Sequence, residues 1–304
     1  MQAEQIDSLN IFRASMSSFL DEHASPEHVA RWTEQKCVDR DTWREAGAFG
    51  LLGLLVPEQY GGLGGDFRHE RILMEEFASR GLEGWGVAVH NMIAAPYLIH
   101  HGTEEQRQRW LPGVVSGETV LAIAMTEPDA GSDLQGMRTR AVKAGDEWVI
   151  NGSKVFISNG QTADLVLVCA KTQLDSGEDK ISIFLVESNA QGFKRGRNLD
   201  KIGRDAQDTS ELFFEDVKVP LDRVLGGEPG KGFAHLMDLL PQERLGIAVM
   251  GLGMLERALR LTVDYVKERK AFGQSLLDFQ NTSFSLAEIK TEATIARVFL
   301  DHCT

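Results

Sequence analysis

The spacing of apolar residues changes twice along this chain, and the two changes restrict the folds that it can adopt. From residue 5 to about residue 117, the apolar positions recur at helical spacing. From about 118 to 225 they form short alternating or fully apolar runs, separated by Gly, Asp and Asn, as in strands. Helical spacing then returns and continues to residue 300. We therefore predict an α+β fold with three consecutive domains, at residues 1–117, 118–227 and 228–304.

Local signals mark the ends of several expected elements. Residues 103–106, Thr-Glu-Glu-Gln, have the capping-box form that begins a helix. Asn151 and Gly152 lie between alternating apolar residues and indicate a hairpin turn between two strands. The first segment is therefore expected to be helical, and the second to be a compact β domain.

Two long antiparallel helices are expected near the end of the sequence, at residues 233–270 and 277–300. One face of the second helix is apolar and contains Leu286, Ile289, Ala293, Ala296 and Leu300. The sequence ends at Thr304 without a later segment that would cover these apolar faces. We therefore expect further helices or another subunit to pack against them.

Composition and charge exclude several classes of protein. The 304 residues carry a formal net charge of −13, and no basic run is present, which argues against direct binding to nucleic acid. Cys37, Cys169 and Cys303 are isolated and have no histidine at metal-ligand spacing, so we expect neither a disulfide nor a metal site. No apolar run reaches the roughly 18 residues of a membrane span, and the first residues do not form a leader. A bacterial cytoplasm is favoured over a mitochondrial matrix.

Residues 125–160 contain two turns that are spaced to lie beside one flat ligand. The first, Met-Thr-Glu-Pro-Asp-Ala-Gly-Ser-Asp at 125–133, follows an apolar run and exposes backbone amides together with the hydroxyls of Thr126 and Ser132. In the second, Phe156 and Ser158 share one face of a strand, where a ring can stack on a flavin and a hydroxyl can bond its edge. The alternative is that both segments are ordinary turns and that Phe156 belongs to the core.

Taken together and in this order, the two turns resemble the flavin-binding signature of the acyl-CoA dehydrogenases. The resemblance extends from Pro-Glu-Gln-Tyr-Gly-Gly-Leu-Gly-Gly-Asp at 57–66 to the last residues, and it is nearest to the long-chain subgroup. It implies a helical N-terminal domain, a central β-barrel-like domain and a C-terminal four-helix bundle, of which about half is present because the usual C-terminal helices are lacking. In the family, the absent part supplies flavin contacts at a subunit interface and, in many members, the catalytic base.

The resemblance implies FAD as the cofactor and assigns the residues that hold it. Thr126 would address the pyrimidine edge of the flavin, Ser158 its hydride-accepting nitrogen, and Arg269 its pyrophosphate across a subunit interface. The full implied set is Ile123, Met125, Thr126, Gly131, Ser132, Phe156, Ile157, Ser158, Arg269, Phe272 and Gln280.

Removal of hydrogen across the α and β carbons of a thioester requires a base and a hydride acceptor. A glutamate becomes a sufficient base when burial raises its pKa. Glu243 is the candidate, at the start of a long helix in which we place Pro241 in the first turn. The alternative is a carboxylate that merely stabilises the helix start. The resemblance of Pro-Gln-Glu-Arg-Leu to the long-chain and isovaleryl enzymes favours the base.

Other residues are assigned to the substrate by the same resemblance. Ser132, Gln242 and Arg244 are expected near the acyl-CoA. Ala234 stands where the long-chain enzymes have a tyrosine near the substrate, so the length and branching of the acyl chain stay open.

The resemblance therefore implies an FAD-dependent dehydrogenase of β-oxidation that converts a saturated medium- to long-chain acyl-CoA to a trans-2-enoyl-CoA. The resemblance further implies electron-transfer flavoprotein as electron acceptor, and a homo-oligomer built as a dimer of dimers, a homotetramer. The alternative is a truncated, non-catalytic fragment or subunit that binds acyl-CoA or a homologous partner. The native acceptor, homo- versus hetero-oligomer assembly and activity of the chain alone are left open.

Overall fold

The computed structural model describes residues 2–304, with side chains from residue 7 onward. The described residues form two compact units. The first contains the segment up to Ser17 together with Phe67–Leu82 and Arg244–Thr304, and the second contains Ser18–Asp66 and Glu83–Glu243. Each unit therefore combines segments that are distant in sequence. The three domain boundaries expected from the sequence stay a prediction.

The second unit begins with helices. Its helical elements are the end of α1 (Gln2–His23), α2 (Pro26–Gln35), α3 (Arg40–Phe49), η1 (Glu58–Tyr60), the π-helix η2 (Val89–Ala94), α5 (Ala95–His101) and α6 (Glu104–Ser116). The predicted capping box of α6 is confirmed: the Thr103 hydroxyl accepts a hydrogen bond from the amide of Gln106 at 3.2 Å, and the Gln106 side chain accepts one from the amide of Thr103 at 3.0 Å. Among residues 2–304, no helix is long and apolar enough to cross a membrane.

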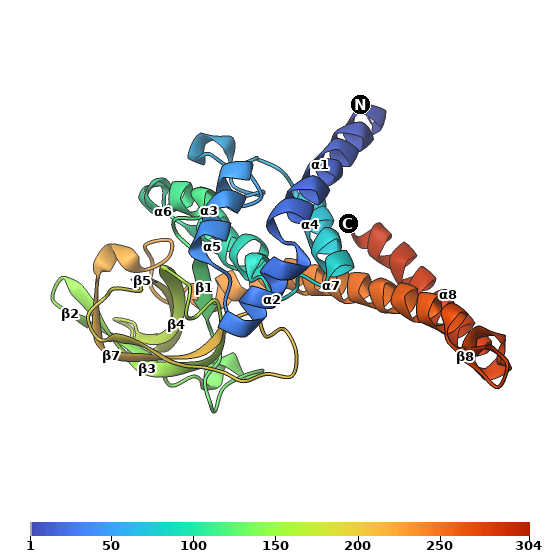
Figure 1. Cartoon of the computed structure of the whole chain (residues 1–304). Helices are drawn as coiled ribbons and strands as arrows, with labels where there is room; N and C mark the ends of the chain where they lie inside the picture. Colours follow the sequence, from blue (N-terminus) through green and yellow to red (C-terminus); the bar gives the residue numbers. More distant parts are fainter. Residues whose placement is uncertain (1) are drawn as a thin grey trace. The chain divides into compact units, whose positions relative to one another are not determined.

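A curled mixed sheet follows in the same unit (Figure 1). Its strands are β1 (Leu121–Ala124), β2 (Arg140–Ala144), β3 (Glu147–Ser158), β4 (Leu165–Gln173), β5 (Asp179–Glu187), β6 (Phe193–Asn198) and β7 (Thr209–Pro220), with the short helices η3 (Leu134–Gly136) and η4 (Leu221–Arg223). The order is β1-β4-β2-β3-β7-β6, and β5 pairs with β4. The predicted α+β fold with a barrel-like β domain is confirmed.

The two faces of this sheet enter different apolar clusters. One cluster contains Trp148, Ile150, Phe184 and other side chains that the strands share among themselves. The second cluster contains residues of β1, β4 and β5 together with α5, α6 and the beginning of α7. Alternation along the strands separates the two sets of side chains, as the period of two requires.

The predicted hairpin turn at Asn151 and Gly152 is wrong. Strand β3 runs through both residues without a turn, and its register with β7 shifts between Ile150 and Gly152. Asn151 instead exchanges two hydrogen bonds of 2.9 Å with Asp216 on β7. Gly152 is required there because a Cβ would lie 2.4 Å from Oγ1 of Thr139. The signal that suggests a turn therefore marks a β-bulge.

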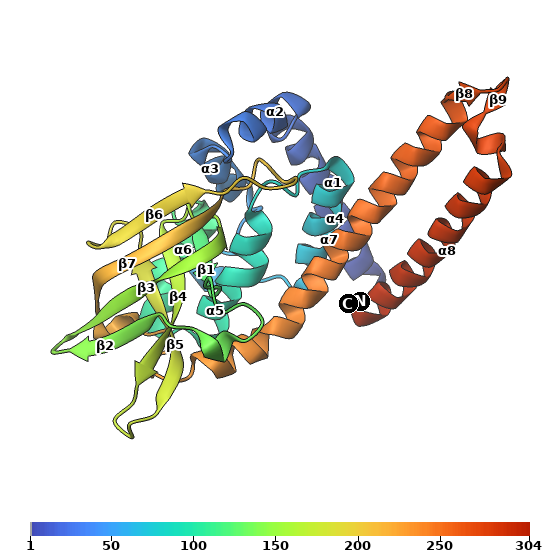
Figure 2. The ribbon, with the colours of Figure 1, turned by 90° about the horizontal axis from the view of Figure 1, so that it is seen from below.

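The first unit is helical apart from one small hairpin. It contains α4 (Phe67–Arg80), most of α7 (Gly232–Glu268), β8 (Lys270–Ala271), β9 (Gln274–Ser275), η5 (Leu276–Asp278) and α8 (Gln280–Cys303). Figure 2 shows α7 and α8 as long antiparallel helices joined through β8 and β9, as predicted. Arg297 of α8 contacts Glu256 of α7 at 2.6 Å and Glu75 of α4 at 2.5 Å.

The predicted position of Pro241 in the first turn of its helix is also wrong. Helix α7 begins at Gly232, so Pro241 lies inside it. Just before the helix, the amide of Gly230 donates to Oγ of Ser182 on β5 at 2.7 Å. Glu243 therefore lies in the helix interior, and stabilisation by the helix start does not account for it.

Candidate active site

The first of the two turns follows β1. It is closed by reciprocal backbone hydrogen bonds between Glu127 and Ala130, of 2.9 and 3.2 Å. Gly131 and Ser132 are exposed beyond this closure, and Thr126 is half-buried. Ile123 and Met125 are half-buried and pack against the apolar cluster that contains α5. The turn therefore presents small polar residues while its apolar end is anchored.

The second turn is the end of β3. Phe156 is 66% exposed, Ile157 is 2% exposed, and Ser158 is half-buried. The register of β3 with β7 shifts between Lys154 and Ile157, so Phe156 lies in a β-bulge, where the strict alternation of faces that the prediction assumed does not hold. The buried Ile157 can offer a ligand only its backbone. Phe156 has φ 61°, a left-handed conformation that is rare for a bulky residue and that often marks a functional site.

A buried ion pair joins the two turns, and no sequence motif marks it. Nζ of Lys154 lies 2.8 Å from Oε1 of Glu127 and donates to the carbonyl of Met125 at 2.9 Å. The Glu127 carboxylate also accepts from the amides of Arg138 and Thr139 at 2.6 and 3.0 Å. Burial opposes ionisation of Glu127, but the hydrogen bonds from Lys154 and Thr139 outweigh it and hold the carboxyl pKa below its ordinary value. One signal in the sequence could have indicated this pair: Lys154 occupies a strand position that alternation predicts to face inward.

Glu243 lies in the apolar setting that its expected role requires. It is 9% exposed and shares a face of α7 with the buried Leu236 and Leu239. The hydroxyl of Tyr97, on α5, donates to Oε1 of Glu243 at 2.7 Å. Tyr97 is fully buried, and burial together with the carboxylate of Glu243 raises the pKa of its phenol.

One apolar cluster connects these surroundings with the first turn. It contains Tyr97, Leu236 and Leu239 as well as Ala130, and Met125 packs against it. The predicted base and the first of the two turns therefore border the same apolar cluster of the second unit.

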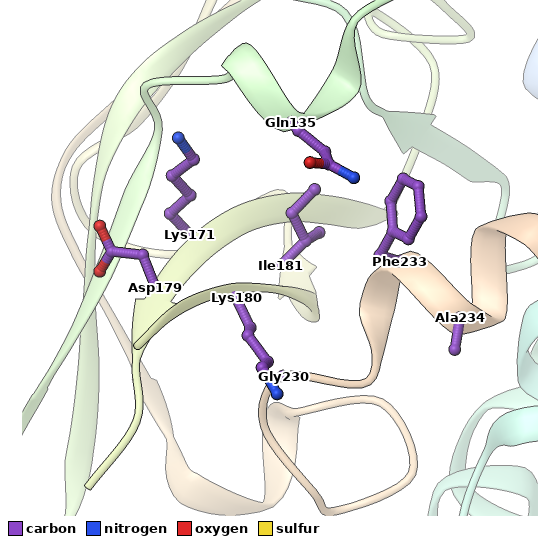
Figure 3. Close-up of a pocket in the computed structure, with 8 residues that line it drawn as sticks. All are labelled: Gln135, Lys171, Asp179, Lys180, Ile181, Gly230, Phe233 and Ala234. Atoms are coloured by element: carbon purple, nitrogen blue, oxygen red, sulfur yellow. The ribbon is translucent and has the colours of Figure 1, made fainter. Parts of the chain in front are cut away.

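A cavity of about 530 Å³ lies beside the beginning of α7 (Figure 3). Its lining residues come from η3, β4, β5, the loop before α7, and α7, and are Gln135, Lys171, Asp179, Lys180, Ile181, Gly230, Phe233 and Ala234. In Figure 3 the side chains of Gln135 and Ile181 extend toward the ring of Phe233, whereas Lys171 and Asp179 lie at the other end. Arg140 binds the Asp179 carboxylate at 2.5 and 3.1 Å and neutralises it.

The remaining predicted site residues come from α7 and the segment that follows it. Gln242 is half-buried, and its Nε2 atom is buried without a hydrogen-bond partner in the structure. Arg244, Arg269, Phe272 and Gln280 belong to the first unit, and all four are exposed.

A tight hairpin fixes the end of α7 that carries Arg269. Phe272 and Gly273 form its two-residue turn, with φ of 52° and 83° as a type I′ turn requires. The carbonyl of Arg269 accepts from the amide of Leu276 at 2.9 Å, which closes the segment. Phe272 is 96% exposed at the tip.

The donor set around the two turns fits a flavin. An isoalloxazine ring requires an apolar surface to stack on and neutral donors around its polar edge. The exposed ring of Phe156 meets the first requirement. The hydroxyls of Thr126, Ser132 and Ser158 meet the second, and the hydrogen bond from the amide of Val155 to the carbonyl of Thr126, at 3.0 Å, connects the two turns that carry them.

Three family models match consecutive parts of the chain. They are acyl-CoA dehydrogenase N-terminal domain at residues 7–118, middle domain at 122–217 and C-terminal domain at 230–304. The mouse mitochondrial long-chain specific acyl-CoA dehydrogenase is 46% identical over 97% of this chain and 68% of its own length. The potato mitochondrial isovaleryl-CoA dehydrogenase is 37% identical over 97% of this chain and 72% of its own.

Solved structures of acyl-CoA dehydrogenases are also similar to this chain. A crystal structure of acyl-CoA dehydrogenase from Geobacillus kaustophilus matches with a TM-score of 0.93 and 45% identity, over 97% of this chain and 78% of that one. Acyl-CoA dehydrogenase from Bacillus anthracis, solved as a complex with FAD, matches with a TM-score of 0.88 and 30% identity, over 96% and 50%. A structure described as electron transferring flavoprotein of Acidaminococcus fermentans matches with a TM-score of 0.87 and 34% identity. The match covers 97% of this chain and 77% of that one.

Proposed function

The chain belongs to the acyl-CoA dehydrogenase family, whose members are FAD-dependent oxidoreductases, and we propose that Glu243 is its catalytic base. The substrate that we propose is a saturated, medium- to long-chain acyl-CoA, and the product is the trans-2-enoyl-CoA. The observation that carries the proposal is a buried carboxylate beside an apolar cluster that also anchors the first flavin-binding turn.

The apolar surroundings of Glu243 suit a base for the weakly acidic α proton. In water a glutamate has a pKa of about 4.3 and is too weak a base for a carbon acid. An acyl chain that displaces water from this side chain would make its charged form less favourable and its proton affinity higher. Substrate binding would thereby prepare the base for proton abstraction.

The residues of the two turns would hold the cofactor. Phe156 offers a ring for stacking, while Thr126, Ser132 and Ser158 offer hydroxyls to the polar edge of the ring. FAD, when bound, accepts the hydride equivalent from the β carbon. In the first unit, the guanidinium of Arg269 has the planar donor geometry that suits a pyrophosphate, and Phe272 and Gln280 complete the predicted contacts.

We assign the cavity beside α7 to the coenzyme A part of the substrate. Lys171 and Lys180 lie in its wall, and the beginning of α7 contributes the positive end of a helix dipole, so that the wall favours phosphate groups. The buried, unpartnered Nε2 of Gln242 is a donor that suits the thioester end of the ligand. Ala234 lines the cavity where a tyrosine would narrow it, so chain length is assigned here only as medium to long.

We further propose electron-transfer flavoprotein as the acceptor and a homo-oligomer as the active form. Large apolar side chains on α7 and α8 of the first unit are consistent with an oligomer, although further helices of the family's C-terminal bundle would also cover them. These side chains include Leu261, Tyr265, Phe284, Ile295, Val298 and Phe299. A bacterial cytoplasm as the location, and a dimer of dimers as the assembly, stay predictions.

An anaerobic absorbance titration tests the proposed base. Purified chain with bound flavin is mixed with saturated acyl-CoA of increasing length, and bleaching of the visible flavin band is followed. Glu243→Gln should bleach at least about 100-fold more slowly while it retains the flavin. Glu104→Gln is the matched control, because Glu104 also accepts a 2.7 Å hydrogen bond from a tyrosine, Tyr60, outside the site.

Unchanged bleaching by Glu243→Gln would remove this residue from the mechanism. A wild-type chain that holds flavin but is bleached by none of the thioesters would contradict the proposed substrate class. A flavin-free monomer in native mass spectrometry would favour the alternative of a non-catalytic fragment.

A further inference from the structure

The contact between Tyr97 and Glu243 has no assigned role in the reaction. The phenol donates to Oε1 at 2.7 Å, and both side chains are buried. A hydrogen bond to an ionised carboxylate in such surroundings is short and strong, because water does not compete for it. This contact therefore determines where one oxygen of the proposed base lies.

Tyr97 is held rigidly. It lies in the first turn of α5, directly after the π-helix η2, and Pro96 precedes it. Its ring has no exposed surface and belongs to the same apolar cluster as Leu98 and Leu236. A π-helix changes the direction in which the next helical side chains point and often occurs at functional sites. The hydroxyl of Tyr97 is thus fixed in place from the α5 side.

Other titratable groups near this pair lie on several elements. The thiol of Cys169, on β4, is fully buried, and burial raises its pKa to about 11, so it is neutral. The ion pair of Glu127 and Lys154 interacts with that thiol from β3 and the first turn. His101 lies on α5, one turn after Tyr97. Its ring stacks on His235 of α7 and lies within ion-pair distance of Asp238 on the same helix.

We infer that Tyr97 is a positioning residue for the catalytic base, and that its hydroxyl orients the Glu243 carboxylate and stabilises its ionised form. The inference rests on the proposed function of Glu243. Burial alone would favour the protonated carboxyl, which cannot accept the α proton. The donated hydrogen bond opposes burial and keeps Glu243 competent as a base before substrate arrives.

Tyr97→Phe removes the hydroxyl and retains the ring. In the full chain labelled with [δ-¹³C]glutamate, the NMR signal that disappears in Glu243→Gln identifies Glu243. The titration midpoint of this signal should rise by about one pH unit or more in Tyr97→Phe, since hydrogen bonds to charged groups contribute that much. The acidic limb of the pH profile of kcat/KM should move upward by the same amount. Tyr60→Phe removes the equivalent 2.7 Å bond to Glu104 and should move neither quantity.

A second substitution should shift the Glu243 titration midpoint in the opposite direction. The chain contains three tyrosines, so Tyr60→Phe with Tyr265→Phe leaves Tyr97 alone to be replaced by 3-fluorotyrosine. The more acidic phenol donates more strongly and should lower the Glu243 midpoint. Equal midpoints in wild type, Tyr97→Phe and the fluorinated protein would overturn the inference. The NMR titration requires no turnover, so loss of the inference is distinguishable from failure of Glu243→Gln to slow the reaction.

Discussion

The ammonium of Lys154 and the carboxylate of Glu127 lie 2.8 Å apart, with side chains that are 0% and 5% exposed. The two residues come from the two turns that we assign to the flavin. Their contact fixes one turn against the other, together with the hydrogen bond from Lys154 to the carbonyl of Met125.

Lys154→Met should destabilise the second unit by about 3 kcal/mol, because it leaves the Glu127 carboxylate buried without its cation. The variant should also lose flavin during gel filtration. Chemical denaturation and the ratio of visible to ultraviolet absorbance measure the two effects. Lys194→Met breaks an ion pair of 2.6 Å with Glu215 at the surface and is the matched control, with a much smaller loss expected. Equal losses in both variants would mean that the buried pair has no special role.

Phe156→Ala should weaken flavin binding by about tenfold or more while the fold is retained, because we propose that the exposed ring stacks on the flavin, and it supports little of the core. Isothermal titration of the flavin-free protein with FAD measures the change. Phe213, a partly exposed ring on β7, provides the control substitution. An affinity unchanged by Phe156→Ala would exclude stacking at this position.

Stability should fall as the pH is lowered from 6.5 to about 4, because of His90. Its ring is fully buried, with Nδ1 accepting from the amide of Leu121 and Nε2 facing the carbonyl of Val114, each at 3.0 Å. Burial lowers its pKa to about 4, so in this interval the unfolded chain binds a proton that the folded chain does not. The unfolding free energy should therefore decrease by roughly 1.4 kcal/mol per pH unit.

Urea denaturation at several pH values measures this dependence. His90→Gln should be less stable at pH 7, but its stability should change less between pH 6.5 and 4. His302→Gln, at the exposed end of α8, should keep the wild-type slope. A slope that is the same in His90→Gln and wild type would assign the effect to other groups.

The proposed binding of phosphate groups by the lysines of the cavity wall can be tested separately from the dehydrogenation step. Lys180→Ala should raise KM for acyl-CoA by about tenfold and leave kcat nearly unchanged, since the lost interaction would be equal in ground and transition states. With an acyl-pantetheine, which lacks the nucleotide phosphates, the variant and wild type should have the same KM. A loss of equal size with both substrates would place Lys180 near the thioester instead of the phosphates.

Gly152→Ala tests the bulge that replaces the expected hairpin. The added Cβ would lie 2.4 Å from Oγ1 of Thr139 and 2.8 Å from its Cα, so backbone must move, at a cost of about 2 kcal/mol. Because the amide of Thr139 binds Glu127, flavin retention should also fall. Gly145→Ala, in the true turn of the β2–β3 hairpin, shares a positive φ but meets no atom within 4 Å, and its thermal unfolding should show a smaller loss.

The order of the secondary structure could be predicted from the sequence because hydrophobic periodicity reports burial directly. The capping box at Thr103 could also be predicted, since each of its contacts is local in sequence. Asn151 and Gly152 misled the prediction because a turn and a bulge both select glycine, and only the contact with Thr139 separates the two. Pro241 misled it because a proline is typical of the first turn of a helix, whereas α7 begins well before it, at Gly232.

The candidate site is only partly readable from the sequence. Glu243 and the two turns carry local motifs, so they could be named, although their roles stay predictions. Tyr97 and the pair of Glu127 with Lys154 carry no motif, because their function depends on partners 146 and 27 positions away in the chain. Long-range partners of this kind become visible only when the fold places them together.

Phe156 and Phe272 both occupy left-handed backbone, at φ of 61° and 52°. Each conformation costs of the order of 1–3 kcal/mol for a side chain of this size, and glycine or asparagine would relieve the cost. A redesign of this protein for stability alone would therefore replace both rings first. The resulting protein would melt at a higher temperature and would lose two of the aromatic groups that we assign to its cofactor, so thermostability is an unsafe guide when variants of this chain are selected.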